Sequence, residues 1–187
     1  MTRLLPLVLL LAVSACASAP PSQLLLDAPT STQRIPAAVR SVELREVSLP
    51  DYAGADTLST REAGGALTAD RDQVWADTPA RGTTLALARN LAAITGARVA
   101  AEPWPFSVLP DVSVKVTAER FLATIPGGVE LTGSYAVAPV ASAISDRDGR
   151  FNITVPLAEG ASPAEVAAAH GRAVEALAVQ IARSLAR

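Results

Sequence analysis

The chain has 187 residues, 50% of them hydrophobic and 18% charged, and its formal net charge is −2. These values predict a folded chain with a core of its own, and they exclude an intrinsically disordered protein and the basic surface that nucleic acid requires. One cysteine and one histidine are too few for a Cys/His zinc cluster or a Cys–His nucleophile pair, so we predict neither a metal nor a cofactor.

The N-terminus has the features of a secretory signal. Arg3 precedes an apolar run over residues 4–13, and small residues then lead to Cys16. This order is typical of a signal peptide. A run of about ten apolar residues is half of what a membrane-spanning helix needs, so we do not predict a permanent span.

The tetrapeptide Val13-Ser14-Ala15-Cys16 resembles the bacterial lipobox. The resemblance implies acylation of Cys16, and the alternative is a spare thiol beside an ordinary signal. We expect a lipoprotein signal peptide over residues 1–15, a lipidated tether over residues 16–22 and a single periplasmic α+β domain over residues 23–187. By resemblance to bacterial sorting rules, Ala17 favours the periplasmic face of the outer membrane over the inner membrane.

Short strands and turns are predicted for the first part of this domain. Alternation predicts a strand over residues 39–49 with a bulge or twist at Glu46, and Leu49 to Tyr52 then form a turn. The other predicted pieces are an edge strand over residues 23–27, a hairpin over 57–61 and 66–68 around Gly64-Gly65, and a charged lead-in over 70–77.

A first helix follows. Thr78 is a good capping residue, and Pro79 suits the first turn because its missing N–H is not needed there. Leu87, Leu91 and Ile94 form an apolar stripe that Leu85 widens, and Gly96 is placed to end the helix. Residues 98–101 are predicted to be a strand.

The rest of the chain predicts a meander and a covering helix. Strands are expected over residues 112–125, with a change of parity near Arg120, and over 129–137 and 151–157, with turns at 126–128 and 146–149. Ser162 to Glu165 form a capping box, and the following helix has an apolar stripe that ends at Leu185. We therefore predict an α+β fold, a mostly antiparallel mixed sheet covered on one face by two helices in a two-layer α/β sandwich.

No constellation of residues predicts catalysis. His170 lies in the apolar stripe of the last helix, where a packed or capped histidine is the favoured interpretation and a catalytic base the alternative. Tyr52, Trp75 and Trp104 lie at irregular edges of elements. They are either packed at the rim of the core or contact a partner protein, where aromatic anchors are enriched.

With these elements placed, the chain resembles the PqiC-like family of ABC-type transport auxiliary lipoproteins from about Gln23 to Ala186. The resemblance rests on the lipobox and on the order of several segments: Val47 to Tyr52, the Trp75 stretch, Leu87 to Leu91, Pro103 to Pro105, Val114 to Tyr135 and Ala169 to Ala178. The chain departs from the family at Ala53-Gly54-Ala55, where Leu, Arg and Pro are expected, and at Tyr135, where tryptophan is common.

This resemblance implies a non-catalytic, lipid-anchored periplasmic subunit of an Mce-type ABC transporter, a system that moves phospholipid or other hydrophobic molecules between the inner and outer membranes. Its partners would be the Mce-domain periplasmic subunit and, through the lipid, the membrane, with a homo-oligomer left open. The alternative from a different class is a free-standing structural envelope lipoprotein, and an unrecognised hydrolase is more distant.

Overall fold

The computed structural model describes residues 20–62 and 64–186. Its strands are β1 (Ser22–Leu24), β2 (Ser41–Leu44), β3 (Thr57–Arg61), β4 (Leu67–Trp75), β5 (Arg98–Ala101), β6 (Val112–Thr124), β7 (Gly127–Pro139) and β8 (Arg147–Leu157). Its helices are α1 (Asp51–Gly54), α2 (Pro79–Thr95) and α3 (Pro163–Leu185).

The eight strands form one mixed sheet organised around β6. One edge of β6 pairs with β7, which pairs with β8, and both of these pairings are antiparallel. The other edge is shared by two parallel strands, β2 near the start of β6 and β3 near its end. β5 continues the sheet beyond β2, and β4 and then β1 continue it beyond β3. The predicted α+β fold with a mostly antiparallel mixed sheet is therefore confirmed, the long pairings being antiparallel and the short ones parallel.

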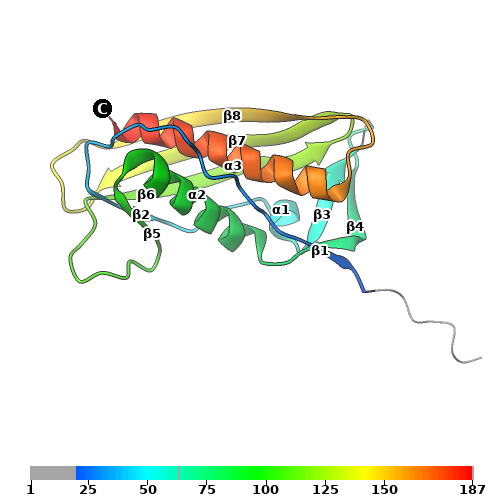
Figure 1. Cartoon of the computed structure of the whole chain (residues 1–187), viewed down its shortest axis with the longest axis horizontal. Helices are drawn as coiled ribbons and strands as arrows, with labels where there is room; N and C mark the ends of the chain where they lie inside the picture. The colour runs from blue at the N-terminus through cyan, green and yellow to red at the C-terminus, as the bar shows by residue number, and fades with distance from the viewer. Residues whose placement is uncertain (1–19, 63, 187) are drawn as a thin grey trace, which may run out of the picture.

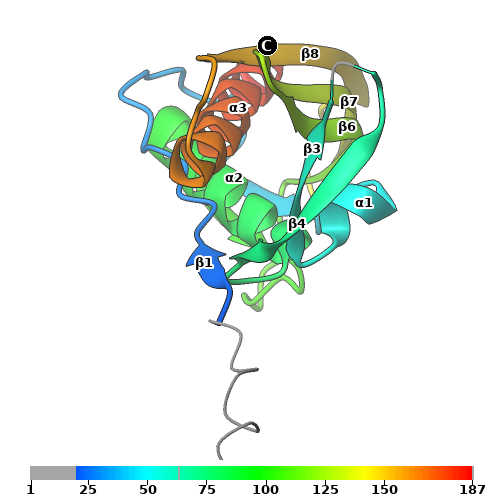
Figure 2. The same cartoon turned by 90° about the vertical axis from the view of Figure 1, so that its right-hand side faces the viewer.

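The two long helices cover one face of this sheet (Figure 1), and the sheet curves around them when viewed along its length (Figure 2). The alternating residues of β6 explain the arrangement, because Val112, Val114 and Val116 are buried while Lys115 is exposed. The core forms where these side chains meet the stripes of α2 and α3. The fully buried side chains there, at 0% exposure, include Leu87, Leu91, Leu177 and Ile181.

Both predicted changes of parity correspond to irregular pairing. The register between β6 and β7 shifts between Ala118 and Arg120. In the segment predicted as one strand over residues 39–49, β2 itself ends at Leu44, which pairs with Val114, and pairing with β6 resumes only at Ser48, opposite Thr117. Four residue steps from Leu44 to Ser48 thus match three steps along β6, as in a bulge. The bulge lets Val47 turn into the core, where its N–H donates to Thr84 Oγ1 at 2.9 Å.

The helices begin and end largely as predicted. Ser162 and Glu165 form the predicted capping box, with Ser162 N–H donating to Glu165 Oε2 at 2.7 Å. Gly96 ends α2 in the left-handed conformation at φ 72°. The predicted Thr78 side-chain cap is wrong, because the Asp77 carboxylate occupies that end, accepting from Thr78 N–H and pairing with Arg81.

Leu85 is also outside the core, with 42% of it exposed. It is two residues from Leu87, which places it about 200° around the helix from the buried stripe.

Three segments differ from the prediction. Residues 51–54 form the short helix α1 rather than a simple turn. The charged lead-in over residues 70–77 is mostly strand, because β4 continues to Trp75 with its polar side chains in solvent. Three of the four residues of the predicted turn at 146–149 lie inside β8, which begins at Arg147. Gly149 is there because a Cβ would come within 2.6 Å of the Tyr135 ring, so it makes room for an aromatic side chain on the neighbouring strand.

Residues 27–38, which we call the strap, run across the two long helices (Figure 1). Ser31 N–H donates to the buried Asn90 Oδ1 at 2.8 Å, and Ile35 N–H donates to Ile94 O at 2.9 Å. A Cβ at Gly171 would lie 2.4 Å from Asp27 O, so α3 has a glycine where the strap crosses it. The strap thereby links the N-terminal strand to the helix layer.

Candidate partner-binding surfaces

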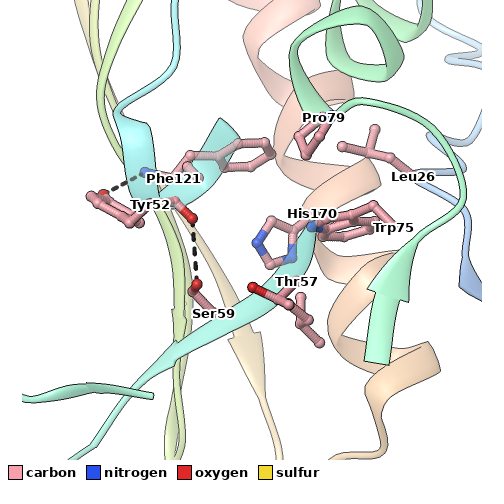
Figure 3. A pocket seen from close by; sticks show the side chains of 10 residues that line it. Leu26, Tyr52, Thr57, Ser59, Trp75, Pro79, Phe121 and His170 are labelled. Carbon is pink, nitrogen blue, oxygen red and sulfur yellow. Dashed lines mark hydrogen bonds between the residues drawn. The ribbon is translucent and has the colours of Figure 1, made fainter. Parts of the chain in front are cut away.

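Tyr52 and Trp75 lie in the lining of the same small pocket, between α1, β3, β4 and α3 (Figure 3). The lining includes Phe121 and His170 and no carboxylate or thiol. The cavity volume is about 10 Å³. That is about the smallest volume that holds one water molecule, so the pocket as it stands is packed rather than shaped for a ligand.

Tyr52 has structural contacts in this pocket. Phe121 N–H donates to its hydroxyl oxygen at 3.3 Å, and Ser59 Oγ donates to its carbonyl oxygen at 3.3 Å (Figure 3). Phe121 follows the shift of register in β6. It lies between Thr117, which pairs with Ser48, and Ala123, which pairs with β3. The tyrosine hydroxyl therefore satisfies a backbone N–H in a gap between two strands.

His170 is buried beside two aromatic rings. The ring centroids of Trp75 and Phe121 lie 5.5 and 4.7 Å from that of His170, both in edge-on arrangements (Figure 3). Its Nδ1 is 2.9 Å from Val166 O. A carbonyl can only accept, so we assign the proton to Nδ1. Burial lowers the pKa of His170 to about 4, against the smaller opposing effect of that hydrogen bond. The packed interpretation of His170 is confirmed, since the ring is neutral at pH 7 and held by its own helix.

Trp75 also borders a shallow groove on the other side. This groove has a volume of about 160 Å³ and is lined by residues of the N-terminal segment and of α2. They include Leu25, which is 69% exposed, and Leu85, which is 42% exposed. Trp75 thus lies at the rim of the core with one side accessible, which is compatible with either predicted role.

Trp104 lies in a different part of the molecule, in the loop of residues 102–111 between β5 and β6, which we call the tip loop. Its indole Nε1–H donates to Val108 O at 2.7 Å, and its ring packs edge-on against Phe106 at 4.9 Å. Phe106, Val108 and Leu109 are exposed by 43%, 75% and 63%. The structure therefore brings Tyr52 and Trp75 together but not Trp104.

Sequence reasoning singled out Trp104 and missed the three apolar residues after it. Their signal was faint: they lie between Pro105 and Pro110 and follow neither a helical nor a strand period. Apolar residues without periodicity in a proline-rich stretch have no element in which to be buried, and that could have identified them. Cys16, the predicted lipidation site, lies outside the described residues.

Two further searches concern the described ranges only. Within residues 20–62 and 64–186, no group of His, Cys, Asp and Glu side chains is arranged to hold a metal ion. Across the same ranges, no helix has the length and apolar character needed to cross a membrane.

Comparison with known proteins gives one family match and similar folds. The model of the family described as "ABC-type transport auxiliary lipoprotein component" matches residues 24–182. None of the curated proteins matches the chain. A crystal structure titled only as an uncharacterized protein has a TM-score of 0.68 at 16% identity and covers 88% of this chain and 98% of its own. The DUF330-family protein XCC0632 from Xanthomonas campestris has a TM-score of 0.66 at 15% identity, with coverages of 88% and 95%. At these identities the two structures show the likeness of the fold alone.

Proposed function

The chain belongs to the family of ABC-type transport auxiliary lipoprotein components, and from this premise we propose that it is the accessory, non-catalytic lipoprotein of an Mce-type transport system. In this role it is anchored through acylated Cys16 at the periplasmic face of the outer membrane. It binds the Mce-domain subunit, while ATP hydrolysis and the conduit for phospholipid or another hydrophobic molecule belong to other subunits. The observation on which the proposal rests is the family match over residues 24–182.

The contacts around the aromatic residues support a binding role rather than a chemical one. The one histidine is buried against Trp75 and Phe121, and its pocket has no carboxylate to orient it as a base. Apolar side chains are instead presented to solvent at the tip loop and beside Trp75. Exposed apolar patches of this kind mark protein or membrane contacts.

Anchoring is tested by metabolic labelling with a clickable fatty acid. The wild-type chain is expected to take up label and Cys16→Ser is expected to take up none. Label on the variant, or none on the wild type, would show that the lipobox interpretation is wrong. The outer-membrane location is tested by fractionating the two membranes of the same cells.

The partner is tested by affinity purification of the full-length lipoprotein with the Mce-domain subunit encoded beside it. Tyr52, Trp75 and Trp104 are the proposed contact residues. Trp75→Ala or Trp104→Ala is expected to weaken binding by about 1–3 kcal/mol if that ring is a hot spot. A melting curve for each variant separates lost contact from lost folding, which matters most for Trp75 because its ring also packs on His170. Absence of any Mce-domain gene nearby, together with no binding, would favour a free-standing envelope lipoprotein.

A further inference from the structure

More than half of the exposed large hydrophobic residues in the described ranges belong to the tip loop or contact its base. Of the seven such residues in residues 20–62 and 64–186, four are Phe106, Val108, Leu109 and Val140. The first three belong to the tip loop, and Val140 is attached to its base, where its N–H donates to Asp111 O at 2.9 Å. A cluster of this kind is unusual for a surface that only faces water.

The tip loop is fixed at both of its ends and across its middle. At its start, the Glu102 carboxylate accepts from Arg45 Nη1 at 2.9 Å and from Glu46 N–H at 2.8 Å. At its end, Asp111 Oδ2 accepts from Arg40 N–H at 2.7 Å. Trp104 Nε1–H closes the middle on Val108 O. The backbone of the loop is therefore held in place while Val108 and Leu109 are exposed, and a surface that is already ordered loses little entropy on binding.

The tip loop is flanked by positive charge. Arg40 and Arg98 line a hollow of about 460 Å³ together with Val108, Leu109 and Asp111. The Arg98 guanidinium lies 4.9 Å from the centre of the Phe106 ring. Neither arginine forms an ion pair within residues 20–62 and 64–186, and the nearby Asp111 carboxylate is engaged by backbone N–H groups. The two guanidinium groups are therefore available to carboxylates of another molecule.

The position of the loop indicates what that molecule is. The described chain begins beside β1, at the opposite end of the long axis from the tip loop, which is the green loop beyond β5 in Figure 1. An anchor attached before β1 holds that end at the membrane, so the tip loop is directed away from the lipid. A two-fold contact with a second copy is also disfavoured, because it would place the arginines of each tip loop against those of the other.

We propose that the tip loop is the docking surface for a protein partner whose contact patch is apolar and rimmed by carboxylates. The proposal rests on the proposed function, in which this partner is the Mce-domain subunit. Phe106, Val108 and Leu109 enter the patch, and Arg40 and Arg98 pair with its rim. Trp104 is then a positioning residue that holds the loop, and the direct contacts are made by the residues after it.

Photo-cross-linking in cells that produce both proteins identifies the occupant. The cross-linking amino acid p-benzoylphenylalanine is introduced at Leu109 in the full-length lipoprotein, and at Leu67 as the control, another exposed leucine outside the tip loop. The expected result is an adduct with the Mce-domain subunit from Leu109 and none from Leu67. Adducts from Leu109 with lipid alone, or with a second copy alone, would overturn the proposal.

Binding of the purified full-length lipoprotein to the same subunit tests the energetics. Leu109→Glu is expected to weaken binding by about tenfold or more with an unchanged melting temperature, because it places a charge at the centre of an apolar contact. Leu67→Glu is the matched control and is expected to change neither quantity. Arg98→Glu is expected to weaken binding more than Arg98→Lys, which keeps the charge.

The outcomes separate this proposal from the proposed function. If the wild type binds the subunit and the folded Leu109→Glu variant binds it equally well, the tip loop is not the docking surface and the proposed function stands. If the wild type neither binds nor cross-links to the subunit, both are overturned.

Discussion

Titration of His170 makes the stability of this protein depend on pH in a defined window. Its pKa is lowered from 6.5 to about 4 because the ring is buried, so the native state resists protonation while the unfolded chain does not. The contribution to stability is complete above pH 6.5 and is lost progressively as the pH falls toward 4, since unfolding then takes up a proton. At pH 5, which is 1.5 units below 6.5, a cost of about 1.36 kcal/mol per unit lowers the free energy of unfolding by about 2 kcal/mol.

Urea unfolding at pH 7.5 and pH 5 measures this loss, and His170→Gln is the control. The variant is expected to be less stable at both values, because it loses the ring contacts with Trp75 and Phe121. Its difference between the two pH values should nevertheless be smaller than that of the wild type by about 2 kcal/mol. The Glu165 carboxyl, whose pKa is lowered by its hydrogen bonds with Ser162, affects stability only at lower pH and equally in both proteins. An equal loss in the wild type and the variant would refute the reasoning.

Three further predictions concern the packing and capping of the helices. Gly171→Ala is expected to destabilise the protein by about 1–3 kcal/mol, because the new methyl group would lie 2.4 Å from Asp27 O. Gly54→Ala is the control, because the Cβ position there has open space and the φ of Gly54 is not positive. A thermal melt that leaves Gly171→Ala unchanged would mean that the strap does not press on α3. Leu177→Ala should cost about 2–5 kcal/mol in urea unfolding, since Leu177 is 0% exposed, and a loss below 1 kcal/mol would contradict its place in the core. Ser162→Ala removes one half of the capping box of α3 and should cost about 1 kcal/mol, whereas Ser162→Asp, which can still accept from Glu165 N–H, should retain most of the stability.

Local rules determined much of the fold from the sequence. The alternation of Val112, Val114 and Val116 predicted the central strand, and the predicted change of parity near Arg120 coincides with the shift of register between Ala118 and Arg120. Ser162 and Glu165 predicted the start of α3, and Gly96 predicted the end of α2. Such signals are legible because periodicity and capping involve residues within a few positions of one another. The family resemblance, built on the order of these segments, is confirmed by the match over residues 24–182.

The candidate surfaces depended on contacts between distant segments. Gly149 was predicted to be a turn residue, and only its position beside Tyr135 on the neighbouring strand β7 shows that it makes room for an aromatic ring. The role of Tyr52 required the gap between the strands that pair with β6, where its hydroxyl accepts from a residue 69 positions away. Trp104 was predicted either to pack at the rim of the core or to contact a partner, and the hydrogen bond to Val108 shows that it holds a loop in which Phe106, Val108 and Leu109 are exposed. Period and capping are encoded locally, whereas the neighbours of a side chain across a sheet or loop are set by register and chain crossing, which the three-dimensional fold alone decides.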